Sequence, residues 1–202
     1  MTGSAGQVPE RVAASTTRRA DLLQVAAMTM AENGIQGSSI RQIAKRAGMM
    51  AGSLYHHFAS KEAMIEEIIT GYWDDLFEGY DTAIAESHGA VDAIERLTTV
   101  SLEVGLKHWA AVQILLGDWK YLSSVMPTLD ASSARVERYW LDQIERGVKE
   151  GVVRPELDPR MAFRVMMGSI TWVFRWFDPE GPRTIYDVVK SQIDIFRSGV
   201  IL

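Results

Sequence analysis

Apolar residues recur at three- and four-residue steps along almost the whole chain, a spacing that predicts amphipathic helices. No stretch shows the strict alternation of a half-buried strand. Glycine and proline separate the periodic stretches, as expected at helix ends. The pattern predicts helices over residues 15–33, 40–47, 50–57, 60–85, 90–106, 108–124, 128–150, 159–177 and 182–198. We therefore expect an all-α fold.

Two of these helices are short and follow each other closely. Ser39 stands at the N-cap position of the first, and Gly48 ends it. The second begins after a turn of only two or three residues, and Ser60 then caps a longer helix. Three helices, with the last two short and joined by a tight glycine-containing turn, describe a helix-turn-helix unit, in which the last helix enters the major groove of DNA.

The second short helix has two distinct faces. Leu54 and Phe58 are four residues apart and point toward the core. The other face combines small residues, which let the backbone approach DNA, with donors for phosphate or base acceptors: Ala51, Gly52, Ser53, Tyr55 and His56. Lys61, at the start of the next helix, adds a cation that can face a phosphate.

The pair His56–His57 also raises the question of a metal site. Adjacent residues lie about 100° apart on a helix, so they cannot readily hold one ion, and zinc sites prefer spacings of three or four. The chain has no cysteine. No phosphate-binding loop, dinucleotide fingerprint, nucleophile elbow or zinc-protease motif occurs either. We expect no metal, no cofactor and no enzymatic activity.

Charge is distributed unevenly between the two parts of the chain. Residues 1–61 carry seven basic and three acidic residues, a net charge of +4, whereas residues 62–202 carry 14 basic and 23 acidic residues, a net charge of −9. A basic first part favours an anionic partner there. Residues 1–14 lack the apolar core of a signal peptide and are predicted to be a disordered arm. No stretch is long and apolar enough for a membrane helix, so we expect a cytoplasmic protein.

Residues 18–69 resemble the DNA-binding domain of the TetR family of bacterial transcriptional repressors. The resemblance is carried by SIRQIAKRAGMMAGSLYHHFASKEAMIEEII, from Ser39 to Ile69. It implies phosphate contacts by Ser39, Tyr55 and Lys61, and a phosphate or base-edge contact by Arg41. It also implies that the groove is lined by Met50, Ala51, Ser53 and His56.

The roles of two residues in this stretch, Met50 and His57, are left open by the sequence. The family usually has Ser or Thr where Met50 stands, and a methionine cannot accept the capping hydrogen bond, which costs the helix start about 1 kcal/mol. Met50 instead offers an apolar surface to a thymine methyl group. His57 either faces DNA or packs toward the interior of the domain.

The resemblance divides the chain into a DNA-binding domain over residues 15–61 and a ligand-binding and dimerisation domain over residues 62–202. All six tryptophans lie in the second part. Tryptophan and methionine suit either a plain core or an adaptable apolar cavity, and the resemblance favours a cavity. Its predicted wall consists of Trp109, Val112, Leu116, Trp119, Tyr139, Met166, Trp172 and Trp176.

The last two helices carry apolar stripes that are too rich for an exposed tail. In the TetR family such helices form a two-fold interface, and one short recognition helix reads few base pairs, so a homodimer on a palindromic operator is expected. The predicted interface residues are Phe163, Met167, Ile170, Phe174, Ile185, Val188, Val189, Ile193 and Phe196.

The sequences of the GSLYHHF and SKEAM segments resemble those of actinobacterial TetR-family members that repress lipid and steroid catabolism genes. That resemblance implies an acyl-CoA or steroid-derived effector, with its phosphates or carboxylate near arginines of the later helices: Arg135, Arg138, Arg164 and Arg175. A generic hydrophobic compound, as for an efflux regulator, is the alternative effector. A protein that activates transcription, and a small-molecule-binding bundle without DNA activity, are the alternative functions.

Overall fold

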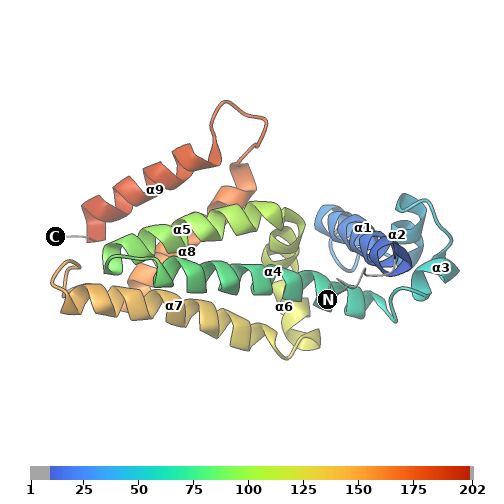
Figure 1. The fold of residues 1–202 in the computed structure, drawn as a ribbon, viewed down its shortest axis with the longest axis horizontal. Helices are drawn as coiled ribbons and strands as arrows, with labels where there is room; N and C mark the ends of the chain where they lie inside the picture. The colour runs from blue at the N-terminus through green and yellow to red at the C-terminus, as the bar shows by residue number, and fades with distance from the viewer. Residues whose placement is uncertain (1–9, 201–202) are drawn as a thin grey trace, which may run out of the picture.

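A computed structural model describes residues 10–200 of the chain, with side chains described from Arg18 to Gly199. Every regular element in this part is a helix, as the sequence predicts (Figure 1). The helices are α1 (Glu10–Asn33), α2 (Ile40–Arg46), α3 (Ala51–Tyr55), α4 (Lys61–Ala85), α5 (Ala90–Lys107), α6 (Trp109–Val125), α7 (Leu129–Lys149), α8 (Pro159–Trp176) and α9 (Ile185–Val200).

The predicted disordered arm, residues 1–14, is wrong at its end, because α1 already begins at Glu10. Residues 1–9 lie outside the described part of the chain. The predicted helix over residues 15–33 therefore starts five residues too late, and the other predicted helices agree with the structure to within three residues.

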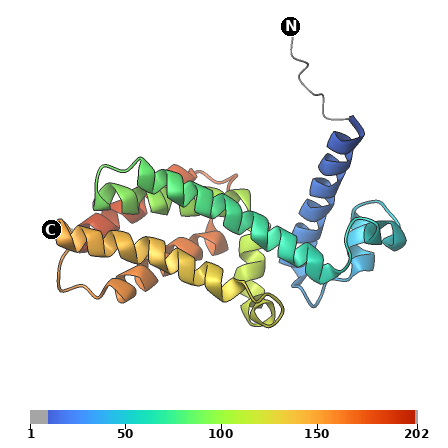
Figure 2. The ribbon, with the colours of Figure 1, turned by 60° about the horizontal axis from the view of Figure 1, so that its bottom comes forward.

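The molecule is elongated, with a small head at one end (Figures 1 and 2). Helices α1, α2 and α3 form the head together with the first turns of α4. Helix α4 runs from the head along the remaining helices, α5 to α9, which form a larger bundle. A change in the direction of α4 therefore changes the position of the head relative to the bundle.

Local sequence explains where the two short helices start and stop. Ser39 and Gln42 form a capping box, in which the Ser39 hydroxyl accepts from the Gln42 N–H at 3.3 Å and the Gln42 side chain accepts from the Ser39 N–H at 2.7 Å. Gly48 turns the chain with φ +67°, a conformation that glycine adopts without strain. Ser60 caps α4 by accepting from the Ala63 N–H at 3.0 Å.

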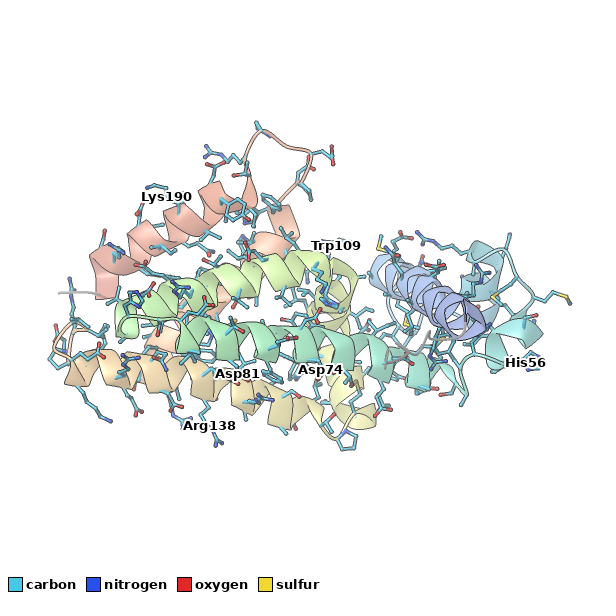
Figure 3. The ribbon with its side chains drawn as sticks, viewed as in Figure 1. His56, Asp74, Asp81, Trp109, Arg138 and Lys190 are labelled. Carbon is cyan, nitrogen blue, oxygen red and sulfur yellow. The ribbon has the colours of Figure 1, made fainter. Side chains whose placement is uncertain are left out.

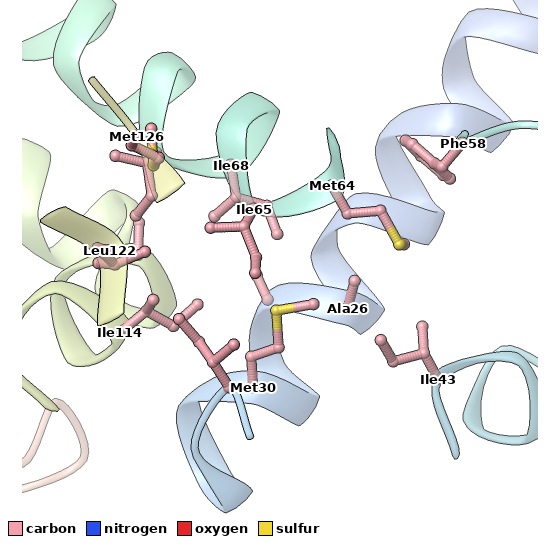
Figure 4. Close-up of a cluster of buried hydrophobic side chains, with 14 of the residues drawn as sticks. Ala26, Met30, Ile43, Phe58, Met64, Ile65, Ile68, Ile114, Leu122 and Met126 are labelled. Carbon is pink, nitrogen blue, oxygen red and sulfur yellow. The ribbon is translucent and has the colours of Figure 1, made fainter. Parts of the chain in front are cut away.

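The head core extends beyond the three N-terminal helices (Figure 4). Met64, Ile65 and Ile69 of α4 are fully buried in it, and so are side chains of α6 such as Ile114 and Leu122. Because residues of α4 up to Ile69 belong to the same buried core as α1, α2 and α3, we place the end of the head inside α4, after Ile69. The sequence prediction placed this boundary at residue 61. The head and α6 consequently form one packed unit.

The core of the bundle is built around Trp140, which is fully buried. Its Nε1 donates to the Tyr80 hydroxyl at 3.2 Å, and that hydroxyl lies 2.6 Å from the Ser101 Oγ. Gly105 allows α5 to approach α8 closely, because a Cβ at this position would lie 2.2 Å from Cζ of Phe174. Among the helices of residues 10–200, none is long and apolar enough to cross a membrane.

Candidate nucleic-acid interface and ligand cavity

Helix α3 lies at the far end of the head, where His56 follows it (Figure 3). Leu54 and Phe58 are 1% and 3% exposed, so they fix the helix on the head core as predicted. The outer surface is formed by Met50, Gly52, Ser53, Tyr55 and His56, all exposed, while Ala51 is half-buried. Met50 is 80% exposed and makes no side-chain capping bond, which leaves an apolar side chain in solvent at the helix start.

Arg19 holds the C-terminal end of α3 in place, a role that the sequence prediction did not identify. Its guanidinium donates to the His57 carbonyl oxygen, pairs with Glu67 of α4 (Nη2 to Oε2, 2.6 Å) and lies 4.2 Å from the centre of the Phe58 ring. The His57 side chain is half-buried beside Phe58. Arg19 therefore joins α1, α3 and α4 at the base of the outer surface.

Helix α2 contributes polar and basic groups next to α3. Ser39 and Arg41 are exposed at its start, and Lys45 is exposed near its end. Arg46, in contrast, is turned back onto α1, where its Nη2 donates to Glu32 Oε1 at 2.8 Å. This pairing, mainly through the side-chain hydrogen bond, lowers the pKa of Glu32. Arg46 is thus held by an ion pair with α1, whereas no ion pair of Arg41 or Lys45 occurs among the described residues.

Lys61 has a different place from the one predicted. Its side chain is half-buried, and its Nζ donates to the carbonyl oxygens of Ile35 and Ser38 at 2.9 and 3.1 Å. Two of its three protons therefore close the turn between α1 and α2. Because hydrogen bonds to backbone carbonyls hold the ammonium group inside the head, we expect a structural role for it in place of the predicted phosphate contact.

In the described part of the chain, no group of three or more His, Asp or Glu side chains lies close enough together to hold an ion.

The bundle encloses a cavity of about 440 Å³ between α4, α5, α6, α7 and α8. Ligand cavities in proteins usually measure about 300–1,000 Å³, so this volume suits a small organic molecule. The predicted residues Val112, Leu116 and Trp119 line it. Sequence reasoning missed most of the wall, which includes Tyr72, Trp73, Leu76, Tyr80, Ser101, Leu115, Val136, Phe163, Met167, Ile170, Thr171 and Phe174.

The other five predicted wall residues lie elsewhere. Trp172 and Trp176 are 65% and 51% exposed on the outer face of α8. Trp109 lines a crevice between the head and the start of α6, and Met166 lines a much smaller hollow beside α9. Tyr139 is half-buried and packs against Phe77 and Tyr80 of α4. Aromatic character alone did not distinguish these positions, because which face of a helix a tryptophan occupies depends on the packing of its neighbours.

The cavity is largely apolar, with a few polar groups at defined places. Burial raises the pKa of the Tyr80 hydroxyl to about 12 and also raises the pKa of Tyr72, so both are neutral donors at neutral pH. The carboxylates of Asp130 and Glu137 belong to the wall as well.

None of the four arginines considered for a charged ligand lines the cavity: Arg135, Arg138, Arg164 and Arg175. All four are exposed. Arg135 lies 3.9 Å above the Phe77 ring and pairs with Asp81 at 3.6 Å. The cavity accordingly suits an apolar ring system better than a phosphate.

The predicted interface residues of α8 and α9 mostly pack inside the chain. Ile170, Phe174, Val188 and Val189 are buried, while Phe163, Met167, Ile185, Ile193 and Phe196 are half-buried against the core of the bundle. The exposed apolar side chains of α8 are Met161, Val165, Trp172 and Trp176. At 100° per residue these four fall within an arc of about 60°.

Gly168 lies in the middle of this stripe, and a Cβ there would meet no atom within 4 Å. Tyr186 and Ile195 of α9 are 64% and 68% exposed. Nine residues apart, these two lie on opposite faces of α9, whereas the four side chains of α8 share one face. An exposed apolar stripe such as that of α8 is typical of a protein–protein interface. The predicted interface residues and this exposed stripe thus lie on two different apolar faces of α8, and the interface itself stays a prediction.

Comparison with known proteins agrees with this architecture. The family model described as bacterial regulatory proteins, tetR family, matches residues 22–68, and the tetracyclin repressor-like C-terminal domain model matches residues 87–200. The transcriptional repressor KstR2 of Rhodococcus jostii is 35% identical over 185 residues, covering 91% of each chain. KstR2 of Mycobacterium tuberculosis is 34% identical over 195 residues, covering 95% of this chain and 97% of its own.

Among solved structures, the ketosteroid transcriptional regulator KstR2 of Mycobacterium tuberculosis superposes with a TM-score of 0.88 at 32% identity, over 98% of both chains. The match therefore includes the head, α4 and the bundle together.

Proposed function

The chain belongs to the TetR family of bacterial transcriptional regulators, and we propose that it is a ligand-responsive repressor that binds a palindromic operator as a homodimer. It acts as a DNA-binding regulator rather than as an enzyme, in the cytoplasm, where its operator lies. Its regulated genes belong to lipid or steroid catabolism, by its similarity to the KstR2 repressors.

The observation that carries this proposal is the outer surface of the head. Leu54 and Phe58 hold a short helix on the core, and its polar residues Ser53, Tyr55 and His56 stand free at the end of the molecule. A helix presented in this way fits the major groove, where side chains from its exposed face reach base edges. Ser39 and Arg41 of α2 would contact the adjacent phosphates, together with Tyr55.

Homodimerisation supplies the second head. We assign the interface to the apolar stripe of α8 rather than to the buried residues of α8 and α9. An interface of two such surfaces resembles a core cut in half, as in permanent dimers. The two heads then face two half-sites of a palindrome.

The cavity takes the effector. Its volume and apolar wall support a ring compound of the kind produced in steroid catabolism, either free or as a CoA thioester. Binding shifts the population toward a state whose heads no longer match the operator.

A generic hydrophobic effector is the second candidate. It is favoured by one observation, namely that Asp130 and Glu137 are the charged groups of the wall, which repel an anionic ligand. Release of operator by the CoA thioester of a partly degraded steroid acid, but not by coenzyme A alone or by unrelated apolar compounds, would support the steroid effector. Release by all apolar compounds alike would favour the generic one.

A further inference from the structure

Helix α6 contains a kink at the point where it passes from the head to the cavity. Asp118 has φ −121° and ψ 23°, which are not helical values, although the residues on both sides belong to Trp109–Val125. Sharp kinks have identifiable causes such as glycine or an interrupted hydrogen-bond ladder, and Gly117 directly precedes this one. The local sequence Gly117-Asp118-Trp119 therefore accounts for the position of the kink.

The Asp118 carboxylate reaches the turn between α1 and α2. Its Oδ2 accepts a hydrogen bond from the backbone N–H of Ile35 at 2.9 Å, across 83 residues of sequence. Gly34, with φ +73°, ends α1 just before Ile35. At a glycine-terminated helix end, the N–H after the glycine commonly turns back to a carbonyl of its own helix. Here a side chain of the bundle accepts it instead.

Lys61 binds the backbone carbonyl group of Ile35, the residue whose N–H donates to Asp118. Its Nζ donates to the Ile35 carbonyl oxygen at 2.9 Å, and Ile35 itself is fully buried. The position of the α1–α2 turn thus depends on one group from α4 and one from α6. A buried N–H without a partner is unfavourable, so loss of the Asp118 contact leaves the turn in a less stable state.

The kink also forms part of the cavity wall. Trp119 follows Asp118 and lines the cavity, as does Leu116, three residues before Trp119. Trp119 is 41% exposed, so part of its indole faces solvent rather than protein. Residues 116–119 therefore line the cavity and also contact the α1–α2 turn of the head.

We propose that Asp118 is a positioning residue that couples occupancy of the cavity to the orientation of the DNA-binding head. A ligand that presses on Trp119 changes the kink and withdraws the carboxylate from the Ile35 N–H. The α1–α2 turn is then released, and with it the relation of α2 and α3 to the bundle. This inference rests on the proposed function, in which the cavity takes the effector and the head binds the operator.

The test measures amide hydrogen exchange at Ile35 in the full, unliganded chain, together with operator affinity by fluorescence anisotropy. Asp118→Ala should accelerate exchange at Ile35 and weaken operator binding by about tenfold, within the range usual for coupling between sites. Asp118→Asn keeps an acceptor oxygen and should stay within about threefold of the wild type. Asp142→Ala, which removes an exposed carboxylate of α7, should change neither quantity.

A second experiment perturbs the cavity by substitution, without a ligand. Ala134 of α7 lines the cavity, whereas Ala131 lies on the outer side of the same helix beside Arg135 and Arg138. Ala134→Trp should accelerate exchange at Ile35 in the presence of Asp118 and add nothing in the Asp118→Ala background. Ala131→Trp should leave exchange unchanged. If circular dichroism shows that Ala134→Trp does not fold, Ala134→Leu takes its place.

Unchanged exchange at Ile35 in Asp118→Ala would overturn the proposal. So would an Ala134→Trp effect of equal size with and without Asp118. Because exchange is read on the free protein, a failure to bind any operator would overturn the proposed function and leave the outcome at Ile35 interpretable.

Discussion

At the scale of the residue, the head separates side chains that face solvent from side chains that hold the backbone in place. Tyr55 and Arg41 are exposed, whereas Lys61 and Arg19 donate to carbonyl oxygens of the head itself. All four are polar residues in or near the helix-turn-helix, so sequence alone does not distinguish the two groups. Only the position of the turn between α1 and α2, which depends on tertiary packing, assigns Lys61 to the interior.

Tyr55 and Arg41 should differ in how salt affects their contribution. Tyr55→Phe should weaken operator binding by roughly fivefold, the loss of one hydrogen bond, with no change in the salt dependence. Arg41→Ala should weaken specific and random DNA alike and reduce the slope of log K against log salt by about 0.9. Anisotropy titrations at several salt concentrations measure both. Equal slopes for wild type and Arg41→Ala would remove Arg41 from the phosphate contacts.

Lys61→Met tests the internal role of that lysine. The variant keeps the length of the side chain but loses both hydrogen bonds, so the free energy of unfolding should fall by about 2 kcal/mol. Because the ammonium does not neutralise a phosphate, the salt slope of operator binding should stay as in the wild type. Urea denaturation and the titrations above provide the two values. A lower slope with unchanged stability would restore the phosphate contact.

Met50 occupies an N-cap position with the extended backbone, φ −77° and ψ 146°, that capping residues adopt. Met50→Ser should therefore raise the free energy of unfolding by about 1 kcal/mol, and Met50→Ala should not. Both variants should lose operator affinity to the same extent if Met50 reads a thymine methyl group. Replacing thymine by uracil in the operator should then abolish the difference in affinity between the wild type and the variants. Unchanged affinity would limit Met50 to the outer rim of the interface.

At the scale of the element, periodicity predicted every helix of the described chain because each buries an apolar stripe. It did not predict which stripe of α8 faces inward. Ile170 and Phe174 pack on the bundle, while Val165 and Trp172 are exposed, and all four are apolar. It did not predict the kink of α6 either, since periodicity does not show the contact that Asp118 makes with a turn 83 residues away.

The outward stripe of α8 makes a direct prediction about assembly. Trp172→Glu places a charge in the middle of the proposed interface and should weaken dimerisation by at least about 2 kcal/mol, as for a central aromatic anchor. Sedimentation velocity at low micromolar concentration should then show a single chain in place of a dimer. Val125→Glu, at an exposed apolar position of α6, is the matched control and should remain dimeric. A dimer that survives Trp172→Glu would place the interface elsewhere.

At the scale of the whole molecule, the head and the bundle share side chains rather than meeting at a linker. Ile114 and Leu122 of α6 are buried in the head core, and α4 continues from that core along the cavity. The sequence prediction placed a domain boundary at residue 61 from the family resemblance, which does not show how far the packed core of the head extends into α4. Continuity of packing is what allows a ligand in the bundle to act on the head.

The most direct measurement is binding of the full chain to its own upstream DNA, compared with shuffled DNA of the same composition, at one physiological salt concentration. The account predicts a palindromic site bound as a dimer and at least about 1,000-fold more tightly than shuffled DNA. Equal affinity for the two DNAs would contradict the assignment as an operator-binding repressor.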